Sequence, residues 1–476
     1  MVTFGARRTL ESPASLAVAL VLAAFMTPVV AQSVTDDDRE LEQIQEILSR
    51  DGPYSIDLLG PLSRLGLIYQ EGEDYALALV TLERAQHIVR INKGLHSMEQ
   101  VPLVRQLITV EEARGNHEGA WDRQQDLLTL LRRHPDDVRT VPVLREIADK
   151  QMEVLAAVIA GQRPPEVILG CFYKQWPTQG EGSCDAGSKS TVVQGMLAEA
   201  QRTYLDAIAV MLRQGLYDSD DLRALELEVL RGVDLMRSRY YKGPTARPVP
   251  MAPAYMGASS LEPWRSRMAA VVQLAEWELP YPSEPSLEAD DDSHVSTKQV
   301  HIMDPYYRGR QSLRRLYAYG AASSTNSSLR QAEAVAQMAD WDLLYSHNGR
   351  AMESYEVARA MLDEAGAPAS SMEQLFAPPT PVVLPAFQPN PLARDESRAA
   401  TGYIDVAFEI TRYGRSRAVE ILDEANASHA AKQDLVALIR TNRYRPRMMG
   451  GVFVDATPVR MRYYLYGSSS PTLATN

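Results

Sequence analysis

The side chains of this 476-residue sequence show none of the spacings that are typical of a catalytic site. An enzyme site usually needs a nucleophile with a base, a cluster of metal ligands or a phosphate-binding loop. The sequence has no glycine-rich phosphate loop, no zinc-spaced histidine and glutamate pair, and no serine in a nucleophile-elbow motif. Its eight histidines are scattered, and no acid completes a ligand set beside His294 and His301. We therefore predict no catalytic residue, no metal, no cofactor and no enzymatic activity.

An acidic run comprises Glu288, Asp290, Asp291 and Asp292, in a segment that has almost no apolar residue. A calcium loop needs alternating ligands and a glycine, and this spacing lacks both. Charge runs of this composition are typical of solvated loops. We expect a loop here, and a calcium site is the alternative.

The only two cysteines, Cys171 and Cys184, lie in a segment rich in proline and glycine, which predicts a loop. In an oxidising compartment an even pair across a short loop is most simply a disulfide. Two unrelated thiols are the alternative. A structural zinc site would need two further ligands.

The N-terminus has the pattern of a signal peptide over residues 1–31. Arg7 and Arg8 precede an apolar run from Leu16 to Phe25, and small residues at Val29 and Ala31 suit cleavage. The run is shorter than the roughly 20 residues that a membrane span needs. We expect export and a mature chain that starts near Gln32. A retained membrane anchor is the alternative.

Composition and charge narrow the class of partner. The 45% hydrophobic and 23% charged residues are typical of globular proteins, and the length suits two to four domains. The net charge of −12 argues against sequence-independent binding of nucleic acid. We expect protein or peptide partners instead.

Most of the chain has the apolar spacing of helices, which predicts a mainly α fold. The sharpest segment, within residues 32–160, resembles one tetratricopeptide repeat, although Arg90 stands where the repeat usually ends in proline. The matching positions are Leu62, Leu65, Gly66, Tyr69, Ala78, Leu82 and Ala85. Weaker echoes follow at Ala120 and at Ala351, Tyr355 and Ala358. Residues 161–376 are expected to hold further helices of the array, two of them within 190–240.

A different pattern begins near residue 396 and runs to 470. Ile404, Val406, Phe408 and Ile410 alternate with a second set of residues, which predicts a strand with one buried face. The second set is Tyr403, Asp405, Ala407 and Glu409. A returning strand, a helix capped by Ser428 and a last strand from Val459 to Tyr466 follow. The expected core joins the inner face of the sheet to the helix: Ile404, Val406, Phe408, Val419, Ile421, Leu435, Leu438 and Ile439. Six prolines within 377–391 predict a semi-rigid spacer over 377–395.

Residues 402–466 resemble the C-terminal domain of TonB-family proteins. The resemblance is carried by Gly402, Gly414, Tyr444-x-Pro446 and Gly451 with Val452. It implies a small α+β domain whose last strand binds a short peptide segment of an outer-membrane protein. Arg460, Arg462, Tyr464 and Tyr466 would share one face of that strand and contact an acidic or apolar peptide. In the alternative, the four side chains only cover the sheet and the arginines protect its edge.

Three functions remain. The first is a periplasmic scaffold or adaptor that binds cell-envelope partners through its repeat groove and its C-terminal sheet. The second is a TonB-type energy transducer for outer-membrane receptors, which requires the leader to be retained as an anchor. The third is a hydrolase of an unfamiliar kind. A cleaved leader and a helical body before the small domain favour the scaffold.

Overall fold

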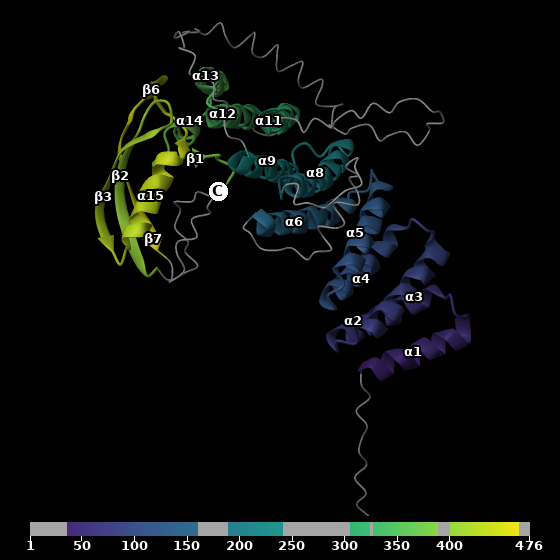
Figure 1. Cartoon of the computed structure of the whole chain (residues 1–476). Helices are drawn as coiled ribbons and strands as arrows, with labels where there is room; N and C mark the ends of the chain where they lie inside the picture. Colours follow the sequence, from purple (N-terminus) through teal and green to yellow (C-terminus); the bar gives the residue numbers. More distant parts are fainter. Residues whose placement is uncertain (1–35, 160–188, 241–304, 324–326, 389–399, 466–476) are drawn as a thin grey trace, which may run out of the picture. The chain divides into compact units, whose positions relative to one another are not determined.

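The computed structural model describes residues 36–159, 189–240, 305–323, 327–388 and 400–465 (Figure 1). The chain divides into two compact units, Met1–Arg123 and Gln124–Asn476, and the division falls within helix α5 (His117–Arg132). Several predictions lie outside the described residues. They concern the leader, Cys171, Cys184, the acidic run, His294, His301 and Tyr466.

Unit 1 consists of helices in which each packs on the next. They are α1 (Asp36–Asp51), the short 3-10 helix η1 (Ile56–Leu58), α2 (Leu59–Glu71), α3 (Tyr75–Lys93), a second short helix η2 (Met98–Gln100), α4 (Val101–Ala113) and the first part of α5. Leu62, Leu82 and Leu107 are buried in a continuous apolar core. A Cβ on Gly66 would lie 2.6 Å from the Leu82 side chain, so the glycine lets α2 and α3 approach closely.

Unit 2 begins with a further series of helices. They are α6 (Thr140–Ile159), α8 (Lys189–Arg213), α9 (Asp220–Tyr240), α11 (Pro305–Ala322), α12 (Ser327–Leu344), α13 (Asn348–Glu364) and α14 (Ala369–Phe376). Each of the first six packs on its neighbour in this order, and α14 contacts α12. The two helices expected within 190–240 are confirmed. The largest fully buried side chain among the described residues, Trp341 on α12, packs on Gly309 of α11.

The same turn ends helices in both units. After α2, the N–H of Glu73 donates to the carbonyl of Gln70 (3.1 Å), and the N–H of Asp74 donates to Tyr69 (2.8 Å). Glu73 has a φ of 62°, so the three features together form a Schellman cap. The same pair of bonds and a positive φ recur at four other helix ends: Gly115, Gly215, Ser346 and Gly366.

Three of these turns place an alanine at the same position of the following helix. Ala78, Ala120 and Ala351 each come five residues after the positive-φ residue, and all three are buried. Each donates its backbone N–H to the residue four positions earlier. The echoes in the sequence therefore correspond to one recurring helix–turn–helix geometry.

The C-terminal part of unit 2, from Gly402 to Leu465, contains the predicted hairpin, helix and strand, and is called the small domain below. Strands β2 (Gly402–Ile410), β3 (Ser416–Ala425) and β7 (Ala456–Leu465) form an antiparallel sheet in the order β3-β2-β7. Helix α15 (His429–Thr441) covers one face of the sheet (Figure 1). The buried core joins the inner face of β2 to Leu435 and Ile439. Ser428 caps α15 by accepting a hydrogen bond from the N–H of Ala431 (3.1 Å), as predicted.

One predicted core position in this domain is wrong. Ile421 lies on β3 and is 37% exposed, whereas Val419 and Leu438 are partly buried against the core. Strand β3 is an edge strand, and shifts in its register with β2 accompany a positive φ at Ala418. The strict alternation that the prediction assumed is therefore interrupted along β3.

The proline-rich segment is not a free spacer along its described length. Strand β1 (Val383–Leu384) pairs with β4 (Arg443–Tyr444), and the N–H of Arg445 donates to the carbonyl of Val382 (2.9 Å). A second short hairpin consists of β5 (Arg447–Met449) and β6 (Val452–Val454). The spacer prediction is therefore wrong for residues 382–384, which pair with the small domain.

Candidate functional site

Strand β7 lies at an edge of the C-terminal sheet. Among the described residues it pairs only with β2, and β3 occupies the opposite edge. Its inward side chains, Met461, Tyr463 and Leu465, pack against the core beneath α15. The edge itself is of the kind that binds an extended peptide by adding a strand.

The predicted cationic and aromatic side chains do share one face. Arg460, Arg462 and Tyr464 lie opposite Ala407, Asp405 and Tyr403 of β2. Cross-strand partners in an antiparallel pair project to the same side, so this face is the one turned away from α15. The fourth predicted residue, Tyr466, lies beyond the described part of the strand.

The two arginines of this face, Arg460 and Arg462, differ in the contacts that they make within the protein. Arg462 donates from Nε and Nη2 to the two oxygens of Asp405, both at 2.7 Å, and its guanidinium lies 3.9 Å from the centre of the Tyr403 ring. The hydrogen bonds from Arg462 lower the pKa of the Asp405 carboxyl. Arg460 is exposed and lies opposite an alanine. Arg460 is therefore the cation of this face with the greater freedom to meet a partner.

A buried ion pair attaches the small domain to the helices of unit 2. Arg445, the middle residue of the Tyr-x-Pro motif, donates from Nε to Asp340 of α12 (2.9 Å) and from Nη2 to the second Asp340 oxygen. Tyr355 of α13 donates to the same carboxylate (2.5 Å), and Arg445 Nη1 donates to the carbonyl of Leu375 (3.2 Å). Both ionic side chains are at most 7% exposed. The small domain and α12–α14 therefore share one polar cluster.

A second buried ion pair links α9 to α11. Arg315 donates from Nε and Nη2 to the two oxygens of Glu226 (2.6 and 2.9 Å), and the Tyr319 hydroxyl donates to the same carboxylate (2.8 Å). Burial, followed by the charge of Glu226, raises the pKa of Tyr319 well above its usual value. Both charged side chains are buried, so the cluster holds the helices together and is closed to a ligand from solvent.

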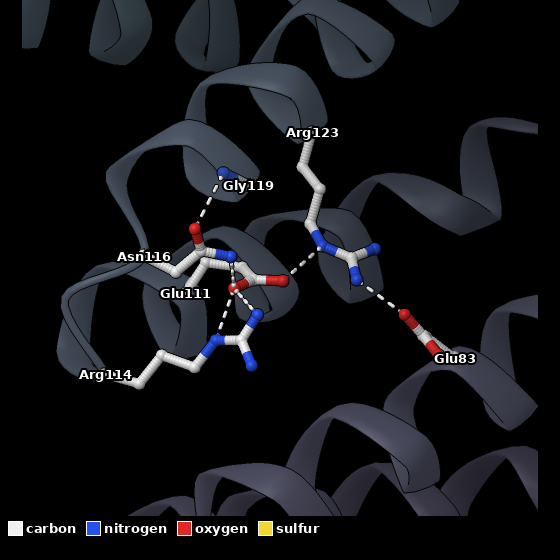
Figure 2. A network of polar contacts seen from close by, with 6 residues as sticks. All are labelled: Glu83, Glu111, Arg114, Asn116, Gly119 and Arg123. Carbon is white, nitrogen blue, oxygen red and sulfur yellow. Dashed lines mark hydrogen bonds and ion pairs between the residues drawn. The ribbon is translucent and has the colours of Figure 1, made fainter. Parts of the chain in front are cut away.

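A third polar cluster, in unit 1, centres on Glu111 of α4 (Figure 2). Its carboxylate is 3% exposed and accepts from Arg114 Nε (2.6 Å), Asn116 Nδ2 (2.8 Å) and Arg123 Nε (3.2 Å). Arg123 also pairs with Glu83 of α3 (2.5 Å). Burial raises the pKa of Glu111, but the three hydrogen bonds outweigh it and leave the pKa below its usual value.

Sequence reasoning missed these clusters for a physical reason. Carboxylates on amphipathic helices were assigned to solvated faces, which is their usual place. The partners of Asp340 and Glu226 lie 105 and 89 residues away, so no local spacing indicates them. A faint signal does exist in unit 1, where Glu111, Arg114 and Asn116 surround one helix turn.

No group of three or more metal-ligating side chains occurs within the described residues. The same part of the chain contains no helix that is both long and apolar enough to cross a membrane.

Comparisons with known proteins leave the family open. No model of a known protein family matches this chain, and no curated protein matches it either. The tetratricopeptide and TonB resemblances therefore rest on the residues and the fold described above.

Proposed function

We propose that this protein is an exported, periplasmic scaffold that binds protein or peptide partners of the cell envelope. In this proposal the helices form a tetratricopeptide-like array, and the small sheet is a TonB-like domain. The single observation that carries the proposal is the edge position of β7, with Arg460 exposed beside Arg462 and Tyr464. An acidic or apolar peptide that added a strand here would meet a cationic and aromatic face.

The attachment of the small domain supports an adaptor over an energy transducer. A transducer must deliver its C-terminal domain to a distant receptor, and a domain on a free tether suits that task. Here Arg445 is buried against Asp340, and β1 joins the preceding segment to the domain. From the sequence we further propose that residues 1–31 are a cleaved leader and that Cys171 and Cys184 form a disulfide. The transducer remains the alternative if the leader is retained.

The proposal is tested by site-specific crosslinking in cells. A photoreactive residue at position 460 should capture a cell-envelope protein, because that side chain lies on the open edge strand. The same residue at position 440, an exposed site on α15, is the matched control. Equal capture at both positions, or none at 460, would refute binding at the β7 edge.

The N-terminal residue of the same recovered protein separates the two functions. A chain that starts near Gln32 supports the scaffold. A chain that retains Met1 and stays in membranes supports the transducer.

A further inference from the structure

A group of arginines gathers where α11 meets the start of α13. Tyr306 of α11 is buried, and its hydroxyl donates to Asp342 of α12 (2.7 Å). The same hydroxyl accepts from Nη1 of Arg310 (3.0 Å) and from Nη1 of Arg350 (2.6 Å). Arg310 Nη1 also donates to both oxygens of Asp342 (2.9 and 3.0 Å). Asp342 is fully buried, so Arg310 is held firmly in place.

A third guanidinium stands beside this group without a partner. Arg314 lies one helical turn after Arg310 on the same face of α11, and its side chain is exposed. Within the described part of the chain it makes no hydrogen bond and no ion pair. The Nε of Arg310 is buried and also has no acceptor there. Arg314 therefore offers accessible donors, whereas the unsatisfied Nε of Arg310 lies below the surface.

The group carries more positive than negative charge. Arg310, Arg314 and Arg350 contribute three cations, and Asp342 is the only carboxylate that pairs with any of them in the described residues. Although Arg314 reaches solvent, neighbouring atoms displace part of its water and so lower its pKa, and repulsion from Arg310 and Arg350 lowers it further. A single carboxylate neutralises at most one of the three charges, and burial raises the pKa of Asp342. An added anion would relieve the repulsion.

We propose that Arg310, Arg314 and Arg350 form a binding site for carboxylates of an acidic peptide segment. A planar guanidinium matches a carboxylate with two parallel hydrogen bonds. Tyr307, adjacent and 64% exposed, packs edge-on against Tyr306 with ring centres 5.2 Å apart and offers aromatic surface to the peptide. An open face with an exposed ring fits a peptide better than a small free anion. The surface belongs to the helical array and does not involve β7.

The first test measures binding of a fluorescent hexaglutamate peptide to the full chain. The protein has a net charge of −12, so a polyanion should be repelled everywhere except at a local basic site. Binding should weaken as salt rises, because Arg314 and Arg350 are exposed to solvent. A hexaglutamine peptide should bind far more weakly. No binding of hexaglutamate at low salt, or equal binding of hexaglutamine, would overturn the proposal.

The decisive variant is Arg314→Gln, because that side chain makes no hydrogen bond or ion pair with any described residue and its loss should leave folding intact. We expect binding to weaken by roughly tenfold or more, the value of one charge-assisted hydrogen bond. Arg84→Gln, an exposed arginine of α3, makes the same change in net charge elsewhere. Equal affinities of the two variants would show that the attraction is not localised at Arg314.

A competition experiment separates a peptide site from a small-anion site. Inorganic phosphate at matched ionic strength should displace hexaglutamate only weakly, since it cannot contact Tyr307. Tyr307→Ala should weaken the binding of hexaglutamate and leave the affinity of the protein for phosphate unchanged. If phosphate displaces hexaglutamate fully and Tyr307→Ala has no effect, the peptide proposal is overturned and the site binds a small oxyanion.

Discussion

Arg445 is the residue on which the attachment of the small domain depends most. Removal of one partner from a buried pair leaves an uncompensated charge, which costs about 3–5 kcal/mol. We therefore expect Arg445→Ala to lower the free energy of unfolding by that amount, because Asp340 stays buried beside Tyr355. The midpoint of denaturant unfolding measures it. Arg440→Ala, at an exposed position of α15, should stay within about 0.5 kcal/mol of the parent. A similar loss in both variants would contradict the assignment.

Glu111 should make the stability of unit 1 depend on pH. Its folded pKa lies below the unfolded value, so its contribution to stability is complete above the unfolded pKa of about 4.3. The contribution is lost as the pH falls through the folded pKa. Glu111→Gln weakens the hydrogen bonds from three donors and should cost about 1–3 kcal/mol at neutral pH.

The difference between Glu111→Gln and the parent should therefore shrink as the solution is acidified. Urea unfolding followed at neutral and acidic pH measures it. Glu71→Gln, an exposed carboxylate at the end of α2, is the matched control and should show little difference at any pH. A constant difference across the acid range would mean that the charge of Glu111 contributes nothing.

At the scale of elements, the crossing of α11 and α12 depends on a glycine. A Cβ at Gly309 would overlap the ring of Trp341, which is buried and donates from Nε1 to the carbonyl of Tyr306 (3.0 Å). Gly309→Ala should therefore destabilise the protein by about 1–3 kcal/mol. At an exposed position within a helix, the same change stabilises a protein by up to about 1 kcal/mol. Thermal unfolding of Gly309→Ala is compared with that of Gly60→Ala, a change near the start of α2. Stabilisation by both changes would be evidence against this packing.

Elements could be predicted from the sequence more fully than their contacts. The alternation in β2 and the Ser428 cap are local signals, and both are confirmed. Ile421 fails because a shift in register depends on pairing between strands, which one strand cannot reveal. The proline run has local stiffness, but its pairing with β4 joins residues about 60 positions apart. The arginine group of α11 and α13 likewise forms only when three helices meet.

For the molecule as a whole, the question is whether the C-terminal domain moves separately from the helices of unit 2. A spacer would let the C-terminal domain move independently of the helices. In unit 2 the two are joined by Arg445 with Asp340 and by the ring of Phe453, which lies 6.2 Å from that of Tyr355. Gly414 also lies near Leu343 of α12, since a Cβ there would be in ordinary van der Waals contact at 3.5 Å. Domain and helices are therefore expected to unfold together.

A shortened chain that ends at Phe376 tests that expectation. It lacks the small domain, so Asp340 loses Arg445 and the apolar side of Tyr355 loses Phe453. Backbone amides of α12 and α13 should then exchange with solvent markedly faster, because opening these helices no longer breaks the buried cluster. Amides of α2 and α3 in unit 1 serve as the internal reference and should keep their rates. If the α12 and α13 amides also keep theirs, the small domain is only tethered to the helices, and the transducer regains its structural support.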